Sequence, residues 1–317
     1  VNVCLDAPLS GTHTFAADTN IDTNPITATP MCTTLQAGST DVCVIAADAI
    51  TVNAGRTLSA SGSRPLVLIA NTITVDGTID VASHVRGRQG PASDLTGCNN
   101  GTNANTTQGG GGQGGSFGGK GGDGGNEDGA SASRGLAGNA LTNVTTLRGG
   151  CPGGHGGRTS FSLGHGGGAL LLVADSITIS STGVVNASGA GAEHGIPNDQ
   201  GGGGGGAGGM IALAATAISL DPSGAIFANG GHGGGGAGNS TSGGDGGDPT
   251  APSSGGTGGA GGDAGGDGAA GYPNATRNGG NGTNNSDGGG GGGGGAGIIH
   301  VYSSTALTGT NVSPAPT

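Results

Sequence analysis

Short aliphatic runs recur along the chain, and each is followed by an alternation of apolar and polar positions and then by a turn. The clearest copy, residues 169–189, has an apolar run that starts at Ala169, the alternation Ile177-Thr178-Ile179, and a third run of small residues after Gly183. Copies in the same order start near residues 42, 66 and 210, and a truncated copy starts at Ile298. Because side chains alternate between the two faces of a strand, this pattern predicts short strands with one buried face.

The spacing of the copies indicates how these strands stack. Ile50 and Ile73 are 23 positions apart in two copies that follow one another directly, which suits one coil of a parallel β-solenoid. Equivalent residues of successive coils would then lie in one buried column. We expect this solenoid core to contain Ile50, Ile73, Ile177 and Ile218. The predicted fold class is therefore all-β, a short parallel β-solenoid.

The sequence divides into a leading segment and a long repeat region. Residues 1–41 are rich in Thr, Asp and Pro, with weak strand character around Thr12–Ala16, and predict an irregular N-terminal cap or extension. Residues 42–317 are predicted to be solenoid coils interrupted by glycine-rich insertions. The expected coils are residues 42–83, 168–189, 210–230 and 297–309, and the expected insertions are residues 84–167, 190–209 and 231–296.

Glycine occupies 81 of the 317 positions, and the insertions have a Gly-Gly-x texture, as in Gly118-Gly119-Lys120 and Gly258-Gly259-Ala260. A period of three matches the three residues per turn of a polyproline-II helix. Glycine on two of the three faces would let such helices pack closely and bond through their backbones. We therefore expect an inserted bundle of polyproline-II (polyglycine-II) helices with antiparallel neighbours. A flexible glycine-rich linker is the alternative.

Two resemblances follow from these motifs. The Gly-Gly-x runs resemble those of the snow-flea antifreeze proteins and of the mycobacterial proteins with polymorphic Gly-rich repeats, although the helical domain that precedes the mycobacterial repeats is missing here. The alternation of strands such as Arg64–Leu68 with glycine tracts such as Gly289–Gly297 resembles the Gly-rich secreted repeat proteins of myxobacteria and related bacteria. That second resemblance covers most of the chain, and it implies a secreted repeat protein without implying an activity.

Charge and hydropathy argue against several classes of partner. The formal net charge is −11 and the chain has a single lysine, Lys120, so we expect no basic patch for nucleic acid or for an anionic membrane surface. No apolar run reaches 18 residues, so no membrane span is expected. The chain begins at Val1, from which we expect an exported protein, extracellular or at the cell surface, with its signal peptide removed.

Five cysteines are typical of an oxidising compartment. Cys32 and Cys43 lie close together before the first repeat. Cys98 and Cys151 bracket the first glycine-rich insertion, and we expect these two to be bonded to each other. These four are the disulfide candidates, and Cys4 is left over, either unpaired or intermolecular. Other pairings among the five remain open at this point.

The ionisable residues form no catalytic or metal-binding motif that we recognise. Seven histidines are scattered along the chain: His13, His84, His155, His165, His194, His232 and His300. Most aspartates of the repeat copies fall at turns, where aspartate is common, and Asp80 is an exception that stands alone rather than in a catalytic pair. We therefore predict no catalytic residue, no cofactor and no metal ligand.

The leading hypothesis is a secreted structural protein, not an enzyme, whose copies join head to tail into an extracellular filament or surface matrix. Solenoid ends present unpaired strand edges, and the sequence shows no amphipathic capping helix. The alternative is a binding module, either an ice-binding protein or an adhesin that contacts a surface or polysaccharide through its glycine-rich face. An ice-binding face would need a regular threonine array, and Ser219 interrupts the row of Thr74 and Thr178. A polysaccharide-acting β-helix enzyme is the third hypothesis.

Overall fold

The computed structural model describes most of the chain as strands, turns and extended segments. The described residues are 3–25, 32, 41–99, 101–128, 133–158, 163–253, 256–283, 287–303, 307 and 311–317. Within these ranges there are fourteen strands and no α-helix, so the protein is all-β. The strands are β1 (Thr12–Phe15), β2 (Thr19–Asp22), β3 (Cys43–Ala46), β4 (Ala49–Val52), β5 (Thr57–Ser61), β6 (Leu66–Ile69), β7 (Thr72–Val75), β8 (Thr78–Asp80), β9 (Ala169–Ile179), β10 (Val184–Asn186), β11 (Met210–Leu220), β12 (Ala225–Phe227), β13 (Ile298–Tyr302) and β14 (Val312–Ser313).

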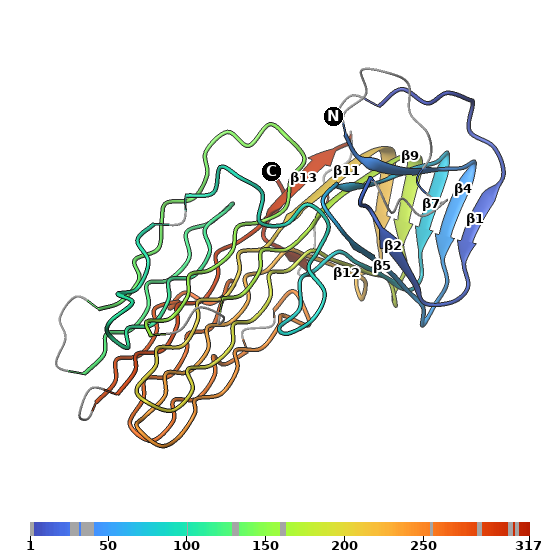
Figure 1. The fold of residues 1–317 in the computed structure, drawn as a ribbon. Helices are drawn as coiled ribbons and strands as arrows, with labels where there is room; N and C mark the ends of the chain where they lie inside the picture. The colour runs from blue at the N-terminus through green and yellow to red at the C-terminus, as the bar shows by residue number, and fades with distance from the viewer. Residues whose placement is uncertain are drawn as a thin grey trace.

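The strands form two sheets, and every pairing between named strands is parallel. The larger sheet has the order β1-β4-β7-β9-β11-β13, with β3 and β6 continuing it beside β9. The smaller sheet has the order β14-β12-β10-β8-β5-β2. Sequence copies contribute to both sheets in turn, so the chain passes from one layer to the other and back (Figure 1).

The core lies between the two sheets and consists almost entirely of aliphatic side chains. Ile50 pairs with Ile73, Ile73 with Ile177, and Ile177 with Ile218, so the isoleucine column expected from the sequence is present. The first three are at most 1% exposed, whereas Ile218 in the last strand is only partly buried. Burial of such side chains stabilises the fold by about 1.5–3 kcal/mol each.

The two sheets begin earlier in the chain than the sequence repeats indicate. β1 pairs with β4 and β2 pairs with β5, so residues expected to form an irregular cap supply an additional strand to each sheet. Phe15 and Ile21 enter the core from these strands and are 4% and 0% exposed. The copy was missed because it has only one inward aliphatic residue and one aromatic residue, too few to show a repeat. Residues 1–2, 26–31 and 33–40 of the expected cap lie outside the described residues.

Two of the later strands are longer than expected. β9 and β11 each run for eleven residues, where the sequence predicts an apolar strand and a separate alternating strand. The two strands pair with each other from Met210 and Ala169 to Leu220 and Ile179, so each supports the other through the expected break. In the earlier copies of the sequence repeat the same two portions remain separate strands, as β3 and β4 and as β6 and β7.

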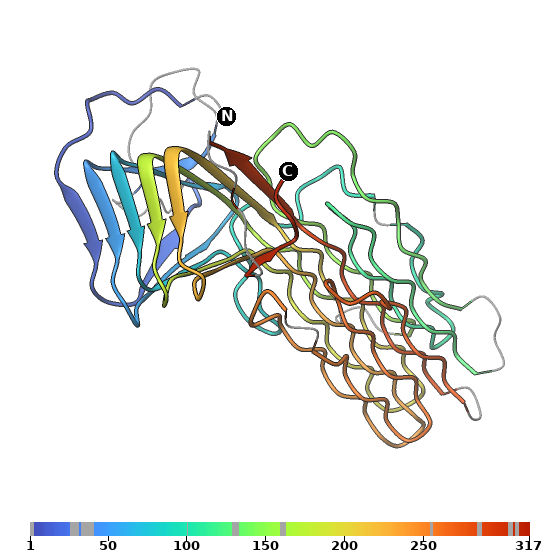
Figure 2. The same ribbon diagram turned by 180° about the vertical axis from the view of Figure 1, so that it is seen from behind.

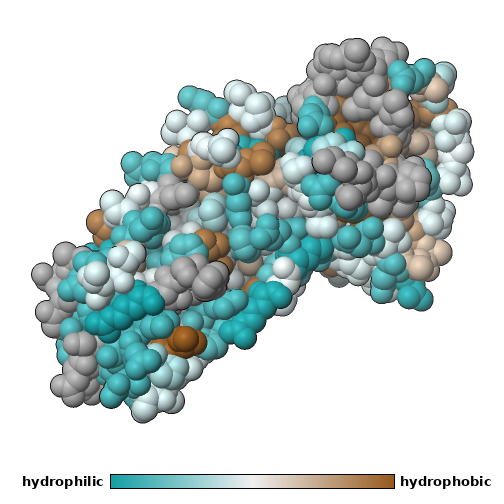
Figure 3. Space-filling view, in the orientation of Figure 1, coloured by the Kyte–Doolittle hydropathy of each residue, from teal (hydrophilic) through white to brown (hydrophobic). Residues whose placement is uncertain are grey.

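The glycine-rich insertions extend away from the sheets as one elongated bundle of segments that run side by side (Figures 1 and 2). They leave from the ends of β8, β10 and β12 and return to β9, β11 and β13. Backbone hydrogen bonds connect segments that are far apart in sequence, for example from the N–H of Gly202 to the carbonyl of Gly289 (2.9 Å). The insertions are thus held in place by their own backbones, and in this view their surface is mainly hydrophilic (Figure 3).

The expectation that neighbouring glycine segments are all antiparallel is wrong. Residues 109–115, 202–208 and 289–295 bond to one another pairwise, and the numbering of the bonded partners rises together in each pair. These three neighbours are therefore parallel. The reason is geometric, because three segments that all contact one another cannot all be antiparallel.

Candidate functional site

Both disulfides expected from the sequence are present. Cys32 and Cys43 join the segment before the first repeat to β3, and Cys98 and Cys151 close part of the first insertion. The Cα–Cα distances are 5.1 and 5.7 Å. Cys4 lies outside both bonds and is exposed. Disulfides of this kind are typical of extracellular proteins.

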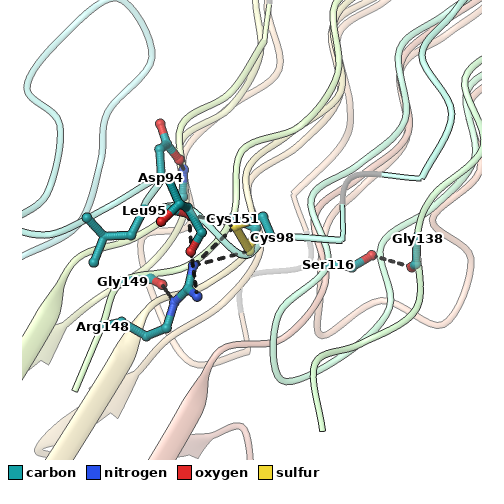
Figure 4. Close-up of a disulfide and its surroundings, with 10 residues drawn as sticks. Asp94, Leu95, Cys98, Ser116, Gly138, Arg148, Gly149 and Cys151 are labelled. Carbon is teal, nitrogen blue, oxygen red and sulfur yellow. Dashed lines mark hydrogen bonds between the residues drawn. A yellow bond between two sulfur atoms is a disulfide. The ribbon is translucent and has the colours of Figure 1, made fainter. Parts of the chain in front are cut away.

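The second disulfide is the centre of a small packed cluster at the root of the bundle (Figure 4). The Arg148 guanidinium donates to the carbonyl of Leu95 at 3.1 Å and to the sulfur of Cys98 at 3.3 Å. Its Cζ also lies 5.8 Å from the centre of the Phe117 ring, which is fully buried. Burial lowers the pKa of Arg148. The Leu95 carbonyl and the Phe117 ring face offset part of this cost of burial, because both interact favourably with a cation.

At the centre of the bundle, residues 288–297 bond to neighbours on every side. The N–H groups donate with a period of three, at N···O distances of 2.8–2.9 Å, to three segments: residues 109–115 (from Gly289, Gly292 and Gly295), residues 277–280 (from Gly290 and Gly293) and residues 228–234 (from Gly291, Gly294 and Gly297). The carbonyls accept from three others: residues 119–125, 202–208 and 266–272. The central segment therefore has six bonded neighbours.

This close approach leaves no room for side chains. A Cβ atom added at Gly291 would overlap the carbonyl oxygen of Gly203, and one at Gly205 would overlap that of Gly231. At most other glycines of the bundle an added Cβ atom would likewise overlap a neighbouring backbone. The Gly-Gly-x texture is thus a packing requirement, because only a backbone without Cβ atoms allows neighbouring segments to bond at this distance.

An ionic network joins the sheets to the bundle. Its centre is His84, whose Nε2 lies 2.9 Å from Asp80 Oδ2 and whose Nδ1 lies 3.2 Å from Asp248 Oδ2. Hydrogen bonds to these two carboxylates, that to Asp248 first, raise the pKa of His84 to about 9. The Asp248 carboxylate also accepts the N–H groups of Val85 and Gly191. One aspartate of the third insertion thus binds the first and second insertions near their starts.

Further ion pairs extend this network. Arg88 donates to Asp80 at 2.6 Å, and Arg86 donates to Asp245 at 3.1 Å. The imidazole of His194 also lies 2.6 Å from Asp245. A cleft of about 270 Å³ lies beside these groups, lined by residues of three glycine-rich segments that include His84, Arg86, His155, His165 and Glu193.

Two histidines on the wall of this cleft, His165 and His155, have different surroundings. His165 Nδ1 lies 2.6 Å from Asp94 Oδ2, and its Nε2 lies 2.9 Å from Gln89. Burial, together with the nearby His165, lowers the pKa of His155. Among the described residues, no group of three or more His, Cys, Asp or Glu side chains has an arrangement that could hold a metal ion. What the cleft offers is a set of imidazole and carboxylate groups that mostly bind one another.

One further histidine is part of the bundle itself. His232 is 1% exposed, and its Nδ1 accepts the N–H of Gly271 at 3.0 Å. Burial lowers the pKa of His232, so the neutral ring is the form that this position favours. The ring nitrogen of His232 thus takes the role that a backbone carbonyl has elsewhere in the bundle, and it satisfies the buried N–H of Gly271.

A second cleft, of about 290 Å³, lies on the outer face of the larger sheet. It is lined by apolar side chains of β9, β11 and β13, among them Leu171, Val173 and Ala212, and by residues 144–147 of the first insertion. Tyr302 at its rim is 62% exposed. The outward apolar positions on this half of the sheet explain why the first strand of each repeat is an unbroken aliphatic run rather than an alternation.

Sequence reasoning found the disulfides and the isoleucine column but not the ionic network. Asp80 appeared isolated, whereas the fold gives it two partners, His84 and Arg88. The spacing of four residues between Asp80 and His84 was the only local feature of the sequence that could have indicated this ion pair. Asp248 lies 164 residues after His84, and only the return of the third insertion brings the two together.

Within the described ranges, no helix has the length and hydrophobicity needed to cross a membrane. No family model, curated protein or solved structure matches this chain.

Proposed function

We propose that this protein is a secreted, non-catalytic structural protein in which a short β-solenoid anchors a rigid glycine bundle, and that copies join end to end in an extracellular filament or surface matrix. The observation that carries this proposal is the six-sided backbone bonding of the central segment, residues 288–297. A bundle of this kind resists bending because each segment is held from several directions, and it needs no large side chains.

Two features support the finer description of the fold. Equivalent residues of successive repeats pair in register, as Leu58 does with Ile79 and Ile79 with Val185, which is the arrangement expected of solenoid coils. In the bundle, successive N–H groups point to three neighbours in turn and return to the first after three residues. This period is that of a threefold polyproline-II helix.

The ends of the larger sheet support self-assembly. Among the described residues, no strand pairs with the outer edge of β1, and none covers residues 217–220 of β11 beyond the end of β13. Neither edge carries the lysine or proline that commonly blocks pairing between molecules. If β1 of one copy paired with residues 217–220 of β11 in another copy, the parallel ladder would continue from molecule to molecule. The resulting assembly would be heterologous and open.

Extracellular location and lack of catalysis are part of the same proposal. The two disulfides favour an oxidising compartment. The groups in the ionic network bind one another: both nitrogens of His84 lie against carboxylates, and Arg88 binds one of the same carboxylates. Such pairing favours a structural role for this cluster over general acid or base catalysis.

Negative-stain electron microscopy of the purified chain tests the assembly, with the variant Thr14→Pro as the probe of the edge. The carbonyls of Gly11 and Phe15 accept bonds from the β4 side, so the N–H of Thr14 points away from β4. Proline at this position removes an outward donor and is compatible with an edge strand. We expect filaments from the natural chain and from the control Thr14→Val, and single particles from Thr14→Pro. Single particles from all three at high protein concentration would overturn the assembly.

A further inference from the structure

The outer face of the larger sheet carries two regular rows of small side chains, over the half formed by β1, β4, β7 and the second halves of β9 and β11. One row contains four threonines and a serine in direct register: Thr14, Thr51, Thr74, Thr178 and Ser219. The other row, two residues earlier on each strand, contains Thr12, Ala49, Thr72, Ser176 and Ala217. The sequence indicated only Thr74 and Thr178, whereas the register adds Thr14 and Thr51 and makes Ser219 the end of the row rather than a gap within it.

The geometry of parallel strands sets the spacing of these positions. Neighbouring strands lie about 4.8 Å apart, and residues two apart on one strand lie about 6.7 Å apart. The ten positions therefore form a nearly rectangular grid, and the five strands that carry it span about 19 Å. The strands lie side by side in one layer (Figure 2). None of the grid positions holds a charged or aromatic residue.

The hydroxyl groups of the grid are available to solvent. Every residue of both rows is exposed or partly exposed, and the residues between the rows, such as Ile50 and Ile73, point into the core. Among the described residues, no side-chain hydrogen bond involves the hydroxyl groups of the two rows. Charged and amide side chains border the grid on both sides: Asp48, Asn71 and Asp175 come directly before the row that starts at Thr12, and Asn53, Asp76 and Asp221 come two residues after the row that starts at Thr14.

We propose that this threonine grid binds the surface of ice. A partner that recognises many identical groups on a fixed two-dimensional lattice must itself be periodic, and the grid spacings are close to the oxygen repeats on faces of the ice lattice. Each threonine presents a hydroxyl, which can take the place of a lattice water, and a methyl group, which can sit between waters. The fixed β-branched rotamers of threonine and the coil-to-coil bonding hold these groups in place before binding.

The chemistry of the grid disfavours other occupants. Sugar rings are commonly recognised by aromatic platforms, and the grid has none. Nucleic acids require cations, and the two rows contain no lysine or arginine. A second copy of the chain would bury ten small, half-polar side chains without an aromatic or arginine anchor, which is a poor interface core. This inference stands apart from the proposed assembly, which uses the strand edges rather than the face.

Partitioning into a slowly growing ice front tests the proposal, with fluorescently labelled protein and ice itself as the probe. We expect the natural chain to be incorporated into the ice, and Thr74→Leu to be left in the liquid. Leucine at this central position projects above the grid and removes one hydroxyl, while the partly exposed site tolerates the change. The matched control is Thr78→Leu on the smaller sheet, where the aligned positions are Thr57, Val184 and Ala225 and form no threonine row.

Three results would overturn the proposal. The first is exclusion of the natural chain from ice. The second is equal incorporation of Thr74→Leu and Thr78→Leu when circular dichroism shows that both are folded. The third is a dimer of the natural chain that Thr74→Leu converts to monomer, which would assign the grid to self-association. Electron microscopy of the same samples reports on filaments independently, so failure of one proposal is distinguishable from failure of the other.

Discussion

The stability of the sheets depends on single aliphatic residues that recur in each copy of the sequence repeat. Ile177 lies at the middle of the isoleucine column, paired with Ile73 on one side and Ile218 on the other, and is 1% exposed. No cation lies in the core, whose described members are all apolar. A charged group introduced here would have neither water nor a partner.

We therefore expect Ile177→Asp to unfold the sheets, since its cost exceeds the roughly 2–5 kcal/mol of an aliphatic truncation in a core. Ile177→Val is the matched control and should cost about 0.5–1.5 kcal/mol. Thermal unfolding followed by far-ultraviolet circular dichroism distinguishes them. A folded Ile177→Asp variant with unchanged thermal stability would contradict the register of this column.

At the scale of the element, glycine segments achieve order that their composition alone would not indicate. Fixing a residue costs roughly 1–2 kcal/mol, and glycine loses more conformational freedom than any other residue. Each segment offsets this loss by bonding to several neighbours, as residues 201–209 do with residues 151–157, 187–193 and 289–295. The bundle therefore forms as a unit, and no single segment is stable alone.

Substitution of glycine by alanine tests this packing at two sites. At Gly291 the added methyl group would overlap the backbone of Gly203, and we expect Gly291→Ala to destabilise the bundle by about 1–3 kcal/mol, as overpacking does elsewhere. At Gly247 the nearest atom to the added Cβ is 3.7 Å away, an ordinary contact. Hydrogen exchange should show faster exchange across residues 201–209 and 288–297 in Gly291→Ala and no change in Gly247→Ala. Equal exchange in both variants would contradict the bonded bundle.

At the scale of the whole molecule, the ionic network around His84 connects the end of β8 to the starts of two insertions and to the return of the third. Two carboxylates, Asp80 and Asp248, hold the protonated imidazole. The pKa of His84 is raised from 6.5 to about 9, so the folded protein binds the proton more tightly than the unfolded chain. This contribution to stability is complete below pH 6.5 and is lost as the pH rises towards 9.

We therefore expect the unfolding temperature to fall between pH 6.5 and 9, and this part of the pH dependence to be absent from His84→Gln. His13→Gln is the control, because His13 lies in β1, away from the network, beside Phe15. Differential scanning calorimetry at several pH values measures the effect. An identical pH profile for the natural chain and His84→Gln would show that this ring does not join the sheets to the bundle.

Local and periodic features of the sequence determined much of this architecture. The Ile-Thr-Ile alternation and the spacing of Ile50 and Ile73 correctly indicated stacked parallel strands, because period two and a constant repeat leave one register that buries every isoleucine. The positions of Cys98 and Cys151 in the first insertion correctly indicated their bond. The Gly-Gly-x texture indicated close backbone packing, since glycine is required wherever another backbone takes the place of a Cβ atom.

Only the tertiary structure decided the features that depend on residues far apart in the chain. The direction of each glycine segment follows from how six neighbours fit around the central one, which no local pattern records. The bond of Asp248 to His84 depends on where the third insertion returns. The threonine row needs the pairing of five strands, and its first member, Thr14, lies in β1, where the sequence has too few aliphatic residues to be recognised as a repeat. Local chemistry sets what each segment can form, and long-range packing sets which segments meet.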